Sequence, residues 1–391
     1  MASKQNDVRR LGIVLALGVA AGFGARYVLS RAANRTATEP GTLVDWEQAR
    51  AIALRVSRWE QAPIDNQAVR HDQYARMVAQ SEPLIAEYMG VNLPAPVSNL
   101  HVVDRRDWLL ANFTSFQNLL EPIEELYTRV ARQSNGSAML GAMNRKVIGA
   151  QMGLLLGFMA QRVLGQYDLS LLSPDPSLRG TLYFVEPNIA RVQQQLGLSD
   201  EDFRLWIALH ETTHVFQFEA FPWVRPYFND LLRGFLGQVS DQLSGLGIDF
   251  GQIVNRVLGG KSTTGDQHWI ETMLTPQQRA LFDKMQALMS LVEGYSNHVM
   301  NAIGERLLPS FRAIEQRIEQ RQKNKSLLEE LFNRITGMDL KLAQYRQGEA
   351  FVNAVVAARG IEFANRVWEQ PEHLPSMAEI LNPQLWIVRM S

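Results

Sequence analysis

The stretch that most constrains this chain is Leu209 to Phe216, which contains the pattern His-Glu-x-x-His. On an α-helix, side chains four residues apart lie one above the other on the same face. His210 and His214 can therefore present two imidazole nitrogens to a single metal ion. Glu211 follows the first histidine directly, where its carboxylate can reach a water on the metal rather than the metal itself. This combination predicts zinc-assisted hydrolysis.

The flanking residues predict that this stretch is a buried helix. Ser199 precedes three acidic residues at 200–202, a typical N-cap followed by carboxylates that favour the helix dipole. Apolar side chains then occupy most sides of the segment as far as Phe218, and Pro222 is expected to end it. The alternative is a coincidental pair of core histidines. Such a pair needs polar partners when it is buried, and a metal ion supplies them.

The composition is that of a globular protein with one or two domains. The chain has 391 residues, of which 46% are hydrophobic, and its net charge is −1. This charge gives no argument for a nucleic-acid partner. The chain has no cysteine, which excludes disulfides and thiolate metal ligands. Residues Gly259 to Thr263 resemble part of a phosphate-binding loop, but Asn255 replaces its first glycine, so no nucleotide partner is expected.

The first 40 residues differ from the rest of the chain. An apolar run from Leu11 to Leu29, with Arg26 near its end, would be about 28 Å long as a helix, close to the ~30 Å of a hydrocarbon core. We expect a membrane anchor, whose orientation is open because basic residues flank both ends. The alternatives are a signal peptide or an ordinary helix, in a secreted or soluble cytoplasmic protein. The predicted division is an anchor or signal-like segment with its linker at 1–40 and one domain at 41–391.

Helical periodicity dominates the larger domain and predicts a mainly α fold with a small β element. Gly149, Gly153 and Gly157 recur at four-residue spacing, which indicates two closely packed helices. Thr181 to Val185 is the clearest strand, and it is either a core strand or one that pairs with an extended substrate. Helices are expected at Trp46–Trp59, Gln67–Met89, Asp104–Arg132 (broken or kinked near Pro122), Met139–Leu164, Pro226–Leu246, Thr275–Ile303, Glu305–Phe332 and Leu340–Arg359.

A catalytic zinc usually has three protein ligands, and two residues are candidates for the third, Glu293 and His298. They lie about 140° apart around a helix axis, so both cannot face one ion. Glu293 belongs to an apolar segment, where an unpaired carboxylate would be costly. Asn297 lies one turn further on the same face, where it could accept a hydrogen bond from a ligand imidazole.

These motifs resemble the gluzincin branch of zinc metallopeptidases, in which H-E-x-x-H is followed by a glutamate ligand on a second helix. From about residue 43 to the C-terminus, the chain is also similar to a family of bacterial zincin-like metallopeptidases, often labelled as associated with deazaflavin-coenzyme biosynthesis. The matching stretches are Gly165–Asp168, Val185–Ile189, His210–Phe218, Glu293–Met300 and Met338–Gly360.

The resemblance implies a mostly helical, zincin-like domain that holds one zinc ion through His210, His214 and Glu293. It implies that Glu211 is the general base and that the protein is a hydrolase, most directly a peptidase acting on a peptide or protein. Two alternatives are compatible with the same residues. One is a zincin scaffold that retains its metal as a binding or assembly module, and the other is a hydrolase of a non-peptide amide or ester.

Two features of the site depart from the family pattern or are undefined by it. Members of the thermolysin type carry an aspartate four residues after the glutamate ligand, whereas this chain has Asn297 there, without the charge that would strengthen a ligand histidine. A peptidase also requires a donor to the oxyanion of its tetrahedral intermediate. The candidate donors are Tyr295, His298, Tyr345 and Arg346.

Overall fold

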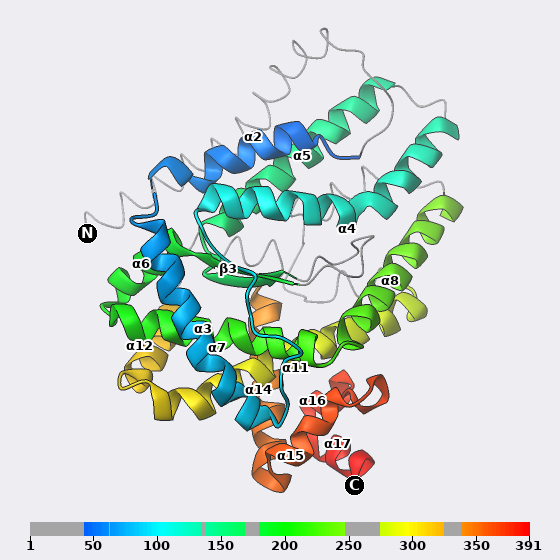
Figure 1. Ribbon diagram of the computed structural model, residues 1–391. Helices are drawn as coiled ribbons and strands as arrows, with labels where there is room; N and C mark the ends of the chain where they lie inside the picture. Colours follow the sequence, from blue (N-terminus) through cyan, green and yellow to red (C-terminus); the bar gives the residue numbers. More distant parts are fainter. Residues whose placement is uncertain (1–42, 62, 134–137, 169–179, 247–273, 324–337) are drawn as a thin grey trace, which may run out of the picture.

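The computed structural model describes residues 43–61, 63–133, 138–168, 180–246, 274–323 and 338–391 (Figure 1). It is mainly helical with one small sheet, as predicted. The segment expected to be an anchor lies outside the described residues, and no helix within them is long and apolar enough to cross a membrane. The α-helices are α2 (Trp46–Ser57), α3 (Gln67–Met89), α4 (Arg105–Gln133), α5 (Ala138–Ala160), α6 (Glu186–Leu196), α7 (Asp200–Val215), α8 (Val224–Leu246), α11 (Pro276–Leu307), α12 (Phe311–Lys323), α14 (Met338–Arg359), α15 (Ile361–Ala364), α16 (Met377–Leu381) and α17 (Pro383–Met390).

The sheet has the strand order β1-β3-β2, with β1 at Leu100–Val103, β2 at Gly165–Asp168 and β3 at Thr181–Val185. The central strand β3 is parallel to β1 and antiparallel to β2. Because β3 is paired along both sides, the suggestion that it pairs with substrate is wrong. The strand at the edge nearest the metal-binding motif is β2.

Helices cover both faces of the sheet (Figure 1). One apolar cluster joins the sheet to α2, α4 and α5, and another joins it to α3, α6 and α7. Leu209 of α7 and Phe216, the residue directly after α7, belong to the largest cluster, which contains residues of α11 and α14. The motif helix is therefore buried between two cores, which explains its apolar character on most sides.

A buried ion-pair network holds the first turns of α7 against α6 and α3. Arg204, which is fully buried, donates to Glu186 and to Asp200. The Glu186 carboxylate also accepts a hydrogen bond from the Tyr74 hydroxyl at 2.7 Å. Ser199 caps the helix as predicted, accepting from the backbone N–H of Asp202. The network orients the helix because each buried charge has a partner of opposite sign.

The glycines of α5 at four-residue spacing, Gly149, Gly153 and Gly157, form a stripe that packs against α2, as the predicted close helix contact requires. A Cβ atom on Gly149 would lie 2.6 Å from the Asp45 carbonyl oxygen, and one on Gly153 would lie 2.5 Å from that of Ala49. These distances are shorter than any van der Waals contact. The stripe therefore permits two backbones to approach closely in a part of the chain without a membrane-spanning helix.

Helix α4 is not broken at Pro122 but is one helix that bends along its length (Figure 1), which agrees with the expected kink. Two other expectations for the helices differ from the structure. Helix α5 ends at Ala160, and the expected helix 305–332 begins instead at Phe311, with its part beyond residue 323 outside the described residues. Strands β1 and β2 and helix α6 were not predicted. Segments of four residues carry too few alternations for a periodicity argument.

We expect Gly153→Ala to lower the free energy of unfolding by about 1–3 kcal/mol, because the added methyl group forces α2 and α5 apart. Gly237→Ala on α8 is the matched control. No atom lies within 4 Å of the position of its Cβ, so better helix propensity should stabilise the protein by about 0.5–1 kcal/mol. Denaturant unfolding measures both changes. Equal changes in the free energy of unfolding for the two variants would contradict the close contact between α2 and α5 at Gly153.

Candidate metal centre

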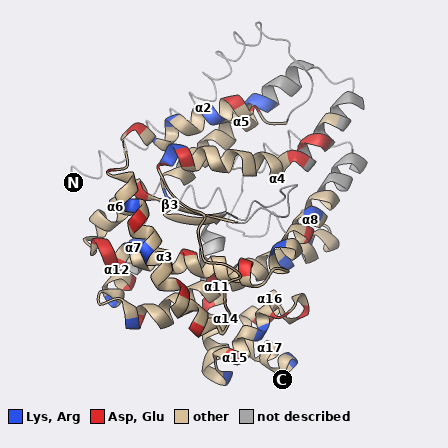
Figure 2. Cartoon of the chain, in the orientation of Figure 1, with Lys and Arg blue, Asp and Glu red and all other residues tan. Residues whose placement is uncertain are grey.

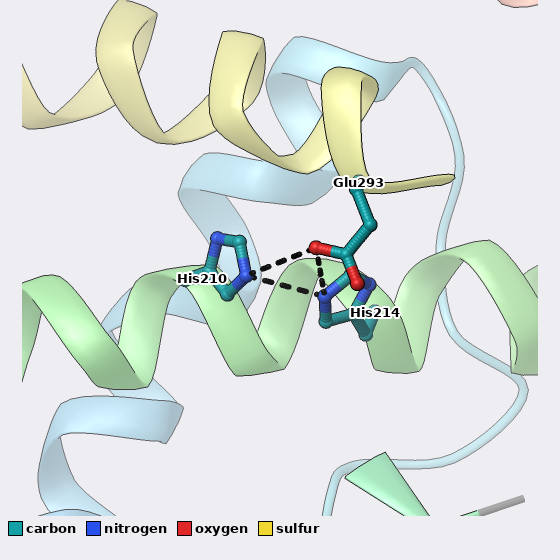
Figure 3. Close-up of side chains that lie close together, drawn as sticks. All are labelled: His210, His214 and Glu293. Carbon is teal, nitrogen blue, oxygen red and sulfur yellow. Dashed lines mark hydrogen bonds and ion pairs between the residues drawn. The ribbon is translucent and has the colours of Figure 1, made fainter. Parts of the chain in front are cut away.

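Three side chains that can bind a metal come together between α7 and α11 (Figure 3). His210 and His214 project from α7, and Glu293 projects from α11 toward them. The three ligand atoms lie within 4.8 Å of one another. Within the part of the chain that the structure describes, this is the only group of three or more His, Asp or Glu residues placed to hold an ion.

The distances within this group suit a tetrahedral ion. The two histidine Nε2 atoms are 3.3 Å apart, and Glu293 Oε2 lies 3.8 Å from each of them. Ligand atoms about 2.0–2.1 Å from a tetrahedral zinc are separated by about 3.3–3.4 Å. The pair of histidines matches this value directly, and a shift of about half an ångström brings the carboxylate to it. Two imidazoles and a carboxylate also form a set of ligands that zinc takes in hydrolases.

Gln217 connects the two helices of the site. Its Oε1 atom accepts a hydrogen bond from His214 Nδ1 at 2.8 Å, and its Nε2 atom donates to the Val292 carbonyl oxygen at 2.7 Å. Because the amide donates to Val292, its oxygen must face the histidine, so His214 carries its proton on Nδ1. The Nε2 lone pair of His214 is then directed into the metal site. Gln217 is fully buried in the π-helical segment Phe216–Ala220.

His210, unlike His214, has no hydrogen-bond partner on its Nδ1 atom among the described residues, although this atom is buried. Burial, together with the neighbouring His214, lowers the pKa of His210 to about 3. The imidazole is therefore neutral at physiological pH, which is the form that coordinates a metal.

The Glu211 carboxylate lies against the start of β2. A Cβ atom on Gly165 would overlap this carboxylate, so only glycine permits the strand to approach so closely. Burial and then the nearby Glu293 raise the pKa of Glu211 to about 8. An elevated pKa near neutrality is typical of a residue that takes up and releases a proton.

A cavity of about 500 Å³ lies beside the three ligands and Glu211. Helices α4, α7, α8 and α11 and strand β2 contribute to its lining. Tyr167 of β2 lines it, but its hydroxyl donates to Glu219 at 2.5 Å. Cavities of this size commonly hold small molecules or side chains of a larger ligand.

The structure places two of the proposed oxyanion donors away from this cavity. The Tyr295 hydroxyl donates to Asn365, and His298 is bonded to Tyr88 and Asn353, on another face of α11. Neither residue lines the cavity, so both assignments are corrected. The two residues turn away because the face of α11 that carries them packs against α14 and the C-terminal segment.

Two further sequence expectations have different outcomes. Asn297 forms a hydrogen bond with the Glu349 side chain rather than with a ligand imidazole, so its expected role is also corrected. The side chains of Tyr345 and Arg346 lie outside the described residues. Gln217 and Gly165 were not singled out from the sequence. Gln217 was accessible to a spacing argument, because a residue three positions after His214 on a helix lies beside it.

We expect Gln217→Leu to weaken zinc binding by about 10- to 100-fold, since loss of a partner that orients a ligand histidine typically has this effect. Competition against a chromophoric chelator measures the change. Gln195→Leu, at an exposed position on α6, is the matched control and should leave zinc affinity unchanged. Unchanged affinity in the Gln217 variant would exclude this role.

The raised pKa of Glu211 predicts a pH-dependent stability for the metal-free protein. Its value of about 8 lies above the unfolded value of about 4.3, so folding favours the protonated form. The wild type should therefore lose stability as pH rises between these values. Glu211→Gln removes that loss and should be more stable than wild type at pH 8, by about 4–5 kcal/mol, and nearly equal to it at pH 4.5.

Denaturant unfolding in the presence of a chelator tests this expectation at both pH values. Glu201→Gln, at an exposed position in the first turn of the same helix, serves as the control and should differ from wild type by less than about 0.5 kcal/mol at either pH. A constant difference between Glu211→Gln and wild type would contradict the raised pKa.

Comparisons with other proteins show which family the chain belongs to. A crystal structure from Chloroflexus aurantiacus, described as "a putative hydrolase with a novel fold", is 59% identical, with a TM-score of 0.67. The match covers 89% of this chain and 99% of that one. A search of curated proteins gave no match. The family model for zincin-like metallopeptidases matches residues 44–387. The chain therefore belongs to the zincin-like metallopeptidase family.

Proposed function

We propose that this protein is a zinc-dependent metallohydrolase and that it cleaves peptide bonds. The observation that carries the proposal is the convergence of His210, His214 and Glu293 within 4.8 Å, beside a cavity that also exposes Glu211. A purely structural metal site has no use for a buried carboxylate next to its ligands. Membership of the zincin-like metallopeptidase family supports the same activity.

The residues divide the chemistry between binding and proton transfer. When bound, zinc supplies a Lewis acid that polarises a carbonyl and lowers the pKa of a water ligand. The Glu211 carboxylate accepts a proton from the attacking water and returns it to the nitrogen of the leaving amine. The carboxyl group of Glu211 must hold the proton between the two transfers, and its place beside the cavity and next to the ligand His210 suits that role.

A rigid pair of side-chain amides stands on the cavity wall, where it can bind a substrate backbone. Trp108 Nε1 donates to Gln166 Oε1 at 2.7 Å, and Gln166 Nε2 donates to Asn112 Oδ1 at 2.9 Å. Asn112 Nδ2 in turn donates to the Trp108 carbonyl oxygen at 2.9 Å. Each amide nitrogen has a second proton. We assign these amides, together with edge strand β2, to positioning the carbonyl groups of an extended peptide.

One observation favours a second candidate, a metal-retaining binding or assembly module. Among the described residues, the ligand histidines lack charged hydrogen-bond partners that would favour fast hydrolysis. His210 Nδ1 has no partner in the described chain, and Asn297 is hydrogen-bonded to Glu349 instead of to a ligand imidazole. Conserved partners of ligand histidines usually raise their basicity. The position of Glu211 beside the cavity argues for catalysis, and the following experiment separates the two functions.

We expect Glu211→Gln to retain one zinc per chain and to hydrolyse peptides about 10²- to 10⁴-fold more slowly than wild type, because the variant cannot accept the proton. Zinc content by elemental analysis and turnover of casein or a mixed peptide library are the measurements. Glu201→Gln on the same helix is the isosteric control and should keep wild-type turnover. Bound zinc without any turnover that depends on Glu211 would favour the binding module.

A further inference from the structure

The cavity beside the metal centre differs in charge from the outer surface. Acidic and basic residues are interspersed over the helices of the described chain (Figure 2). In contrast, the histidine and carboxylate side chains that line the cavity are His210, His214, Glu211 and Glu293. All four belong to the metal centre. No lysine or arginine of the described residues lines this cavity.

Most of the remaining wall is apolar. Helix α4 contributes Phe116 and Leu119, α8 contributes Phe228, and α11 contributes Leu288 and Met289. In Figure 1, α4 lies on one side of this region and α7 and α11 lie on the other, with α8 at its end. An occupant of the cavity that reaches the metal ligands therefore meets apolar side chains from three helices.

Two of these side chains lie outside the hydrophobic cores of the described residues. Leu119 and Met289 are half-buried and line the cavity, yet neither belongs to any of the hydrophobic clusters that form the cores. Other members of the wall, such as Phe116 and Phe228, also pack against a core. The surface of Leu119 and Met289 is thus available for contact with an occupant.

The physical consequences for an occupant are opposite for ionic and apolar groups. A carboxylate, phosphate or ammonium group against this wall would lose hydration without gaining a partner of opposite charge. A leucine- or phenylalanine-sized group would bury apolar area, which is worth roughly 10- to 100-fold in affinity. A free peptide terminus at this wall would also lack a counter-charge, whereas an internal peptide segment carries none.

We propose that the wall formed by Phe116, Leu119, Phe228, Leu288 and Met289 is a specificity site for a large aliphatic or aromatic side chain next to the bond that is cleaved. The substrate class is an internal peptide segment with such a residue, rather than a charged or phosphorylated one. This inference rests on the proposed function, because the metal ligands define where the cleaved bond lies.

Two hydroxamate probes test the proposal on the zinc-loaded full chain. The hydroxamates of N-acetyl-leucine and N-acetyl-aspartate share the zinc-binding group and differ in the side chain beside it. Calorimetric titration should give about 10- to 100-fold tighter binding of the leucine compound. Leu119→Lys should reduce this ratio at least about tenfold, through the loss of apolar contact and the gain of a cation near the aspartate.

Leu154→Lys is the matched control, because Leu154 is an exposed leucine of α5 outside the cavity. The ratio of the affinities for the two hydroxamates should be the same in this variant as in wild type. Met289→Lys provides a second variant with the same expected effect as Leu119→Lys, from the opposite helix. Equal affinities of the two probes, or a ratio unchanged in both cavity variants, would overturn the specificity site.

The outcomes also separate this inference from the proposed function. Discrimination between the probes without any peptide hydrolysis dependent on Glu211 would support the specificity site and refute the peptidase. Hydrolysis dependent on Glu211 that shows no preference for an apolar residue beside the cleaved bond would refute the specificity site and support the peptidase.

Discussion

The site depends on the connection between α7 and α11 through Gln217. A single buried amide accepts from His214 and donates to the carbonyl oxygen of Val292, the residue before Glu293. One side chain therefore sets both the tautomer of the second histidine and the position of the third ligand relative to it. The amide is placed by a π-helical segment directly after the motif, an irregularity that often occurs at functional sites.

Glycine makes the surrounding packing possible. A Cβ atom on Gly165 would overlap the Glu211 carboxylate, and one on Gly294 would overlap the backbone of α14 at Gly348. These residues place the edge strand on one side of the site and α14 behind the helix that carries Glu293. The absence of side chains at these positions lets three backbone segments approach the metal centre without displacing its polar groups. The same principle holds α2 to α5, away from the site.

The wall of the cavity has two chemically different parts. The hydrogen-bonded amides of Asn112 and Gln166 offer directional polar contacts, and the apolar side chains from α4, α8 and α11 offer none. Such a division suits a peptide, whose backbone needs hydrogen bonds and whose side chain needs a matching environment. Helix α4 contributes to both parts, through Asn112 and, two turns further along, Leu119.

Local patterns in the sequence determined much of this protein. Helical spacing alone brings His210 and His214 to one face, and Ser199 begins their helix. The glycine spacing in α5 also predicted a close helix contact, because the periodicity of a helix relates sequence distance directly to direction. These features need no knowledge of the rest of the chain.

Only the tertiary structure decided which residue joins the two histidines. Glu293 and His298 occupy the same helix, and its rotation directs the carboxylate to the site and the imidazole to Tyr88 and Asn353. That rotation results from packing against α7 and α14, which are distant in sequence. The same holds for Gly165, whose strand is too short to be recognised by alternation. Contacts between distant segments lack the fixed geometry of a helix turn, so spacing in the sequence cannot specify them.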